Sequence, residues 1–207
     1  MITNIIVYNR PSLNVEYDYV GIIDGLSDEE RHDFAITQDL TTILSTAGVQ
    51  PVVVRVGKRL ELLSALEWFW KQALDGKKFM LHFVAHGNDE GIAAATEFCD
   101  WATLRPYLQK IHSATGETLL LNMSTCKGLH GIKITGTSGE HPFFGLIGAK
   151  SDLKVDDALA ANRKVYKKWL AGMPVQLIVP ETNTELGKEL LFNISSEGYR
   201  ALSIQDG

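Results

Sequence analysis

Cysteine is scarce in this sequence, which contains only Cys99 and Cys126 and no Cys-x-x-Cys pair. A disulfide framework and the common structural zinc patterns are therefore excluded, because both need several cysteines at close spacing. Each thiol needs its own explanation. Cys99 stands beside Asp100 and Trp101 at an expected helix start, and we interpret it as a small buried hydrophobic residue.

The sequence also lacks long apolar runs, a positive net charge and a leader-like N-terminus. Its longest apolar stretches are strand-sized, such as residues 52–54 and 119–121, whereas a membrane span needs about 18 or more apolar residues. The net charge of −5 gives no basic field to neutralise phosphates. Residues 1–8 have no basic segment before a brief apolar stretch. The sequence predicts a cytoplasmic protein without a nucleic-acid or membrane partner.

Internal repeats, low-complexity tracts and Pro/Ser-rich linkers are absent as well. The hydrophobic fraction of 45% and the charged fraction of 22% are typical of a globular protein with a substantial core. We therefore expect residues 1–207 to form a single domain.

Short apolar segments alternate with amphipathic ones along the chain. The expected strands are residues 5–8, 19–23, 51–56, 79–85, 119–123, 143–147, 190–195 and 201–204. The expected helices are residues 27–47, 60–74, 101–111 and 157–170, with residues 175–179 either a helix continuation or a strand. Buried strands alternating with helices predict an α/β fold with a doubly wound, mostly parallel sheet and helices on both faces.

Two segments have clear local signals. Ser27 and Glu30 form a capping-box pattern at the start of the first helix, and Gly48 ends that helix. Residues 128–139 contain four glycines, which predicts a mobile loop that acts as a gate.

Two of the expected buried strands lead directly into reactive residues. Residues 79–85 are followed by His86 and Gly87, and residues 119–125 are followed by Cys126. The carboxyl ends of parallel strands meet at one sheet edge, so we expect His86 to act as a base for a Cys126 thiolate nucleophile. The backbone N–H groups of Gly87 and Cys126 would then form an oxyanion hole.

The segments Val84-Ala85-His86-Gly87 and Leu120 to Gly128 resemble those of the caspase-like cysteine peptidases, which include caspases, metacaspases, gingipains and the bacterial CHAT proteases. Their spacing is slightly shorter than the roughly 50 residues found in caspases. The resemblance implies a caspase-like fold and a cytoplasmic thiol protease that cleaves a protein or peptide substrate through an acyl-enzyme, with no cofactor. Ser124-Thr125 replace the Gln-Ala of true caspases, so the CHAT-like and metacaspase-like branches fit better.

The same resemblance implies a substrate pocket for the P1 residue, the one before the cleaved bond. In this family the pocket is built from the nucleophile loop and the segment after the next strand, which here contain Ser124, Ser151 and Asp152. A carboxylate there implies cleavage after Arg or Lys. We expect Asp156 and Asp157 instead to stabilise the start of the following helix.

Several alternatives remain open. The domain could be a catalytically idle caspase-like interaction module, or His130 or His141 could replace His86 as the base. His82 and His86 lie too far apart on a strand to share a metal ion, so no metal site is expected.

An amidotransferase-type Gly-x-Cys-x-Gly elbow is missing around Cys126, because no glycine stands two residues before it. A chain of this length has no room for an attached sensor domain. The sequence therefore predicts that any regulation comes from a separate regulatory protein or a small ligand.

Overall fold

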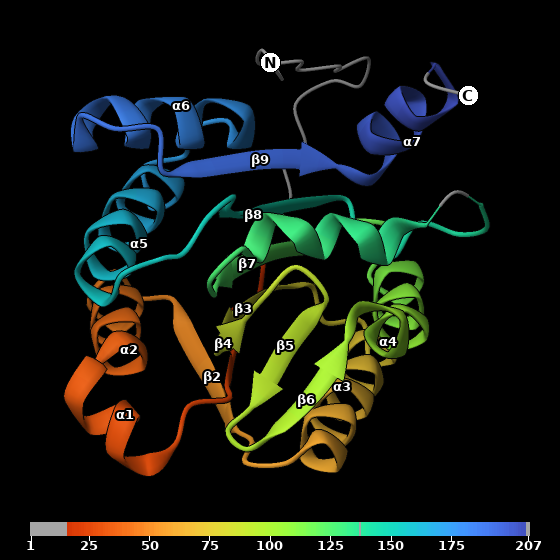
Figure 1. Ribbon diagram of the computed structural model, residues 1–207, viewed down its shortest axis with the longest axis horizontal. Helices are drawn as coiled ribbons and strands as arrows, with labels where there is room; N and C mark the ends of the chain where they lie inside the picture. The colour runs from red at the N-terminus through yellow and green to blue at the C-terminus, as the bar shows by residue number, and fades with distance from the viewer. Residues whose placement is uncertain (1–15, 137, 206–207) are drawn as a thin grey trace.

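A computed structural model describes residues 16–136 and 138–205, and a six-stranded sheet forms its centre (Figure 1). The strand order is β2-β1-β3-β7-β8-β9, and every neighbouring pair is parallel except β8 and β9. The strands are β1 (Tyr19–Asp24), β2 (Gln50–Arg55), β3 (Phe79–Val84), β7 (Leu120–Ser124), β8 (Gly145–Ala149) and β9 (Leu191–Ser195). The α/β class and the mostly parallel sheet are confirmed. The strand expected over residues 5–8 lies outside the described residues.

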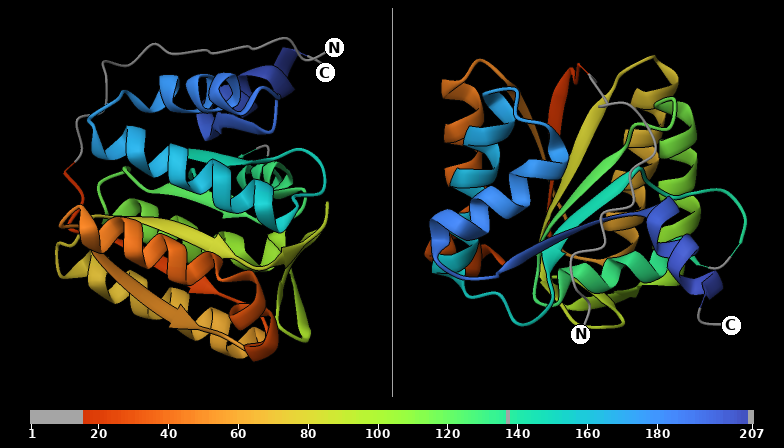
Figure 2. Two further views of the ribbon diagram at one scale, coloured as in Figure 1. Left: turned by 90° about the vertical axis from the view of Figure 1, so that its left-hand side faces the viewer. Right: turned by 90° about the horizontal axis from the view of Figure 1, so that it is seen from above.

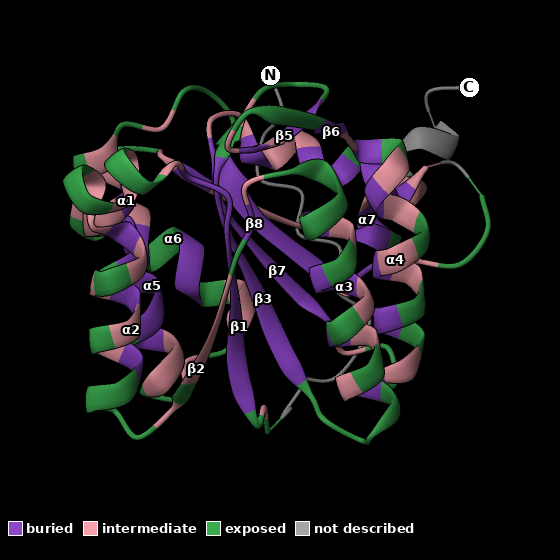
Figure 3. Cartoon of the chain, turned by 90° about the horizontal axis from the view of Figure 1, so that it is seen from below, coloured by how far each residue is buried: buried purple, intermediate pink, exposed green. Residues whose placement is uncertain are grey.

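Helices cover both faces of the sheet, as Figures 2 and 3 show. One face is covered by α2 (Ile36–Thr46), α5 (Val155–Leu170) and α6 (Val175–Leu186) and the other by α3 (Arg59–Leu74) and α4 (Trp101–Ala114). Buried strand residues alternate between the two cores. In β1, Tyr19 and Ile23 pack with α3, while Val20 and Ile22 pack with α2 and α5.

The helix expected over residues 27–47 is instead two helices. Ala35 adopts the left-handed conformation with φ 51° and separates α1 (Asp28–Phe34) from α2. The capping box of Ser27 and Glu30 is confirmed at the start of α1. Among the described helices, none is both long and apolar enough to cross a bilayer.

The glycine-rich segment is not the open loop that the sequence predicted. Residues Gly128–Thr135 form a 3-10 helix, η1, in which Ile132 and Ile134 are buried. The turn after it is held by Arg200, which donates hydrogen bonds to the carbonyl oxygens of Thr135, Gly139 and Glu140. Burial of these apolar side chains favours a helix where glycine content alone indicated a loop, while the expected gating motion stays a prediction.

Residues 201–204 belong to a helix, α7 (Ser196–Gln205), and not to the expected strand. For residues 175–179 the helical alternative is correct, because they begin α6. A second, three-stranded antiparallel sheet was missed because its strands are very short: β4 (His86–Gly87), β5 (Gly91–Ala94) and β6 (Glu97–Asp100). This small sheet follows β3 directly, so it fixes the backbone of His86 and Gly87.

Candidate active site

His86 and Cys126 occupy equivalent positions at the ends of neighbouring strands. Strands β3 and β7 are parallel partners, and their last registered pair is Val84 with Ser124. His86 and Cys126 each stand two residues beyond that pair. The sheet therefore brings the two segments to the same edge, as the buried strand pattern predicted.

The loops after these strands touch through Gly87. A Cβ atom built on Gly87 would lie 2.8 Å from the carbonyl oxygen of Cys126 and 3.0 Å from the Cβ of Thr125. Any side chain at position 87 would clash with this backbone. The glycine therefore permits the close approach of the histidine segment to the cysteine segment.

The pairing of β4 with β5 determines the direction of the Gly87 N–H. Asn88 N–H donates to Gly91 O at 3.0 Å, and Gly87 is registered with Ile92. Antiparallel pairs alternate between hydrogen-bonded and non-bonded, which makes Gly87–Ile92 the non-bonded pair. The Gly87 N–H consequently points away from β5, as a donor to a substrate carbonyl requires.

The imidazole of His86 lies against a carboxylate from α1. Its Nε2 atom is 2.6 Å from Glu30 Oε1, and about half of the His86 side chain is exposed. Hydrogen bonds from the Ser27 backbone, and then from His86, lower the pKa of Glu30 to about 2. Glu30 is therefore ionised and can only accept, so His86 Nε2 carries the proton. In the sequence, Glu30 matched only a capping pattern.

Cys126 is half-buried, and its sulfur contacts the segment after β8. Leu153 N–H donates to Cys126 Sγ at 3.4 Å, and Lys127 N–H donates to Ser151 O at 2.9 Å. Lys127 adopts the left-handed conformation with φ 54°. The chain therefore turns sharply at Lys127, directly after Cys126, and continues into η1.

Ser124 does not face a substrate pocket, contrary to the expectation. Its side chain is buried and its Oγ lies 2.8 Å from His82 Nε2 and 2.9 Å from Asn162 Nδ2. The other nitrogen of His82 lies 2.7 Å from the hydroxyl of Tyr166. Complete burial lowers the pKa of His82 to about 3, so this ring is neutral. Ser124 therefore belongs to a polar network within the core.

Ser151 and Asp152 are exposed and lie in the segment that contacts the cysteine loop. Their role in substrate binding stays a prediction. Asp156 and Asp157 lie in the first turn of α5, as expected, and Asp157 also pairs with Lys188.

The other histidines and the second cysteine lie elsewhere. His130 lies half-buried in η1, and burial lowers its pKa, with nearby cations adding to the effect. His141 is half-buried. Burial of His112 and, to a smaller extent, the charge of nearby His141 lower the pKa of His112 to about 4. Cys99 is fully buried, and burial raises its thiol pKa to about 11. Cys99 is thus an inert core thiol, as predicted.

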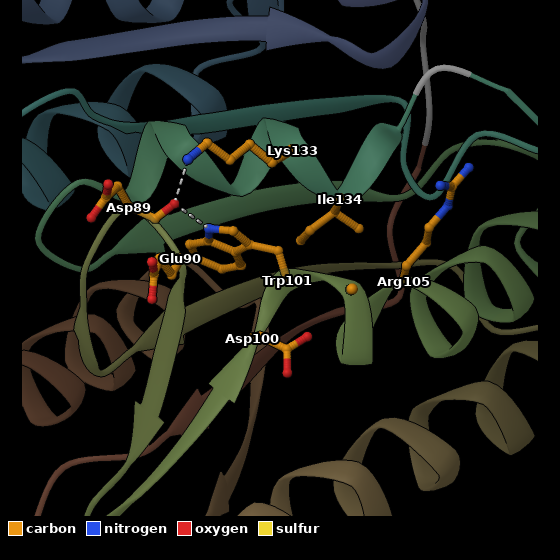
Figure 4. Close-up of a pocket in the computed structure, with 8 residues that line it drawn as sticks. Asp89, Glu90, Asp100, Trp101, Arg105, Lys133 and Ile134 are labelled. Carbon is orange, nitrogen blue, oxygen red and sulfur yellow. Dashed lines mark hydrogen bonds between the residues drawn. The ribbon is translucent and has the colours of Figure 1, made fainter.

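A cavity of about 330 Å³ lies between the loop after Gly87 and η1 (Figure 4). The carbonyl oxygen of Asp89 accepts hydrogen bonds from Lys133 Nζ at 2.7 Å and from the Trp101 indole at 3.2 Å, which ties the two walls together. The lining residues are Asp89, Glu90, Asp100, Trp101, Ala102, Arg105, Lys133 and Ile134.

Within the part of the chain that the structure describes, no three His, Cys, Asp or Glu side chains gather as a metal ion would need. Neither a family model nor a curated protein matches the sequence.

Proposed function

We propose that this chain is a caspase-like cysteine endopeptidase in which Cys126 is the nucleophile and His86 the base. The observation that carries the proposal is the placement of these two residues. They follow the paired residues Val84 and Ser124 at one edge of the sheet, and Gly87 packs directly against the Cys126 backbone.

The free ring nitrogen of His86 suits it to accept a proton. Because Nε2 donates to Glu30, Nδ1 is the ring nitrogen left to take the proton of the Cys126 thiol. The thiolate then attacks the carbonyl carbon of the substrate, and the N–H groups of Gly87 and Cys126 stabilise the resulting oxyanion. His86 returns its proton to the leaving amine as the C–N bond breaks. Water then hydrolyses the thioester and restores the thiol.

The structure corresponds to a resting arrangement in this proposal. The sulfur of Cys126 contacts the Leu153 backbone, and His86 contacts Glu30. Proton transfer to His86 would start from a sulfur that contacts the Leu153 backbone. The same contact favours the second candidate, a catalytically idle module of this fold that only binds a partner.

The substrate side chains would lie on either side of the thiol. Exposed Ser151 and Asp152 contribute to the P1 site and favour Arg or Lys. The cavity beside Asp89 would receive residues beyond the cleaved bond, since two of its walls follow His86 and Cys126 along the chain, while α4 forms the third.

The proposal is tested with Cys126→Ala and His86→Ala proteins and a library of fluorogenic peptides. We expect each substitution to abolish cleavage while thermal unfolding changes little, because thiol and base act as one unit. Cys99→Ala is the matched control and retains activity if it folds. Cleavage by Cys126→Ala at the wild-type rate contradicts the assignment. A wild-type protein that cleaves nothing and has an unreactive Cys126 supports the idle module.

A further inference from the structure

The geometry points to Glu30 as a positioning residue that orients His86 for proton transfer, and this inference rests on the proposed peptidase function. Glu30 lies in α1, at the start of the helix that follows β1, far from His86 and Cys126 in the sequence. The contact that links it to the site is the 2.6 Å hydrogen bond between His86 Nε2 and Glu30 Oε1.

The two oxygens of the Glu30 carboxylate have different partners. Oε2 accepts from the Ser27 backbone N–H at 2.9 Å and from the Ser27 hydroxyl at 2.8 Å, which completes the capping box. Oε1 accepts from His86. The capping bonds fix the carboxylate in one orientation, so the helix cap also holds the acceptor for the imidazole.

The helix that carries Glu30 is itself held to the end of β1. None of its residues is fully buried, and Phe34 at its end packs against the core under α2. Polar contacts add to this packing: Arg31 Nε lies 3.2 Å from Asp24 Oδ1, and Leu26 N–H donates to the same oxygen at 3.1 Å. The Asp24 side chain is 1% exposed and that of Arg31 15%. This buried ion pair sets α1 against the sheet edge where His86 emerges.

The bond to Glu30 has two consequences for His86. It determines that Nε2 rather than Nδ1 carries the proton, since the carboxylate can only accept. It also opposes rotation of a ring that is otherwise half exposed. Because Glu30 remains ionised well below neutral pH, its negative charge also stabilises the imidazolium that forms when His86 takes the thiol proton.

The test compares Glu30→Gln, Glu30→Ala and the control Glu29→Gln, which removes the same charge from the same exposed turn. Glutamine at position 30 preserves the capping box, so folding is retained. We expect Glu30→Gln to lower kcat roughly 100-fold with KM unchanged, and Glu29→Gln to match the wild type. Equal kcat for Glu30→Gln and the wild type overturns the inference.

A second measurement needs no substrate. In Cys126→Ala protein, the ¹⁵N shifts of His86 report which ring nitrogen is protonated. We expect the Nε2-protonated form, and a mixture of both forms after adding Glu30→Ala. An unchanged tautomer in the double variant overturns the positioning role even if no peptide is ever cleaved. If Glu30→Ala changes the His86 tautomer but the wild-type protein cleaves no peptide, the positioning role of Glu30 is supported and the peptidase proposal is rejected.

Discussion

Gly87 packs so closely against Cys126 that its missing side chain determines how near the histidine and cysteine segments can lie. A Cβ atom at position 87 would lie 2.8 Å from the Cys126 carbonyl oxygen, which leaves no space for a methyl group. The contact is between two backbones, which cannot rotate away as a flexible side chain could. The spacing between histidine and cysteine segments is therefore set by the backbone at position 87.

Gly87→Ala is expected to reduce both activity and stability. The methyl group would displace the β4 segment from Cys126, costing roughly 1–3 kcal/mol of unfolding free energy. Displacement of His86 and of the Gly87 N–H by about 1 Å would lower kcat/KM roughly 100-fold. Urea denaturation and peptide cleavage measure the two effects. Gly57→Ala, whose added Cβ meets only a Glu61 oxygen at 3.5 Å, is the control, and equal behaviour of the two variants contradicts the prediction.

Ser124→Ala is expected to act on stability, because Ser124 belongs to the buried network. The substitution removes the hydroxyl that forms hydrogen bonds with both His82 and Asn162, so each of these buried side chains loses one hydrogen-bond partner. We expect a loss of roughly 1–3 kcal/mol in unfolding free energy. Ser151→Ala, at an exposed position, should change stability by less than about 0.5 kcal/mol. Unchanged stability of Ser124→Ala would show that the network contributes little.

The stability of the protein is expected to fall as pH decreases from about 6.5 toward 3. Burial lowers the pKa of His82 to about 3 in the folded state, while the unfolded chain protonates this ring near its ordinary value of 6.5. Between these values the unfolded state binds more protons, so unfolding free energy decreases by up to about 1.4 kcal/mol per pH unit. Denaturation at pH 7 and pH 5 measures the slope. His82→Gln should reduce this slope, and an identical slope would exclude His82 as its cause.

Asp152→Ala is expected to weaken the preference for a basic P1 residue. Asp152 is exposed, and an exposed ion pair contributes about 0.2–1 kcal/mol. The ratio of kcat/KM for Arg over norleucine substrates should therefore fall roughly two- to fivefold. Asp156→Ala removes a neighbouring exposed carboxylate in the first turn of α5 and should leave the ratio unchanged. A library screen that returns an acidic or small apolar P1 preference contradicts the role of Asp152.

Local sequence patterns were sufficient to predict the main strands of the sheet and the positions of His86 and Cys126 at one edge of it. The mostly apolar runs at residues 79–84 and 120–124 predicted central strands without any knowledge of their neighbours, and both segments are buried throughout. His86 and Cys126 follow these runs directly. The parallel pairing of β3 with β7 then places both at one edge, which is a general property of such sheets.

The roles of Ser124 and Glu30 were decided only by tertiary structure. A serine two residues before a candidate nucleophile is equally compatible with a substrate pocket and with the core. Only the positions of His82 and Asn162 around Ser124 place it in the core. Glu30 matched a local capping pattern, which is formed by neighbours in the chain. Its second partner, His86, is brought to it by the β1–β3 pairing and the Arg31–Asp24 ion pair. Sequence alone therefore determined the local structure that each residue favours, whereas contacts between distant segments, which depend on how the elements pack, decided which side chains meet.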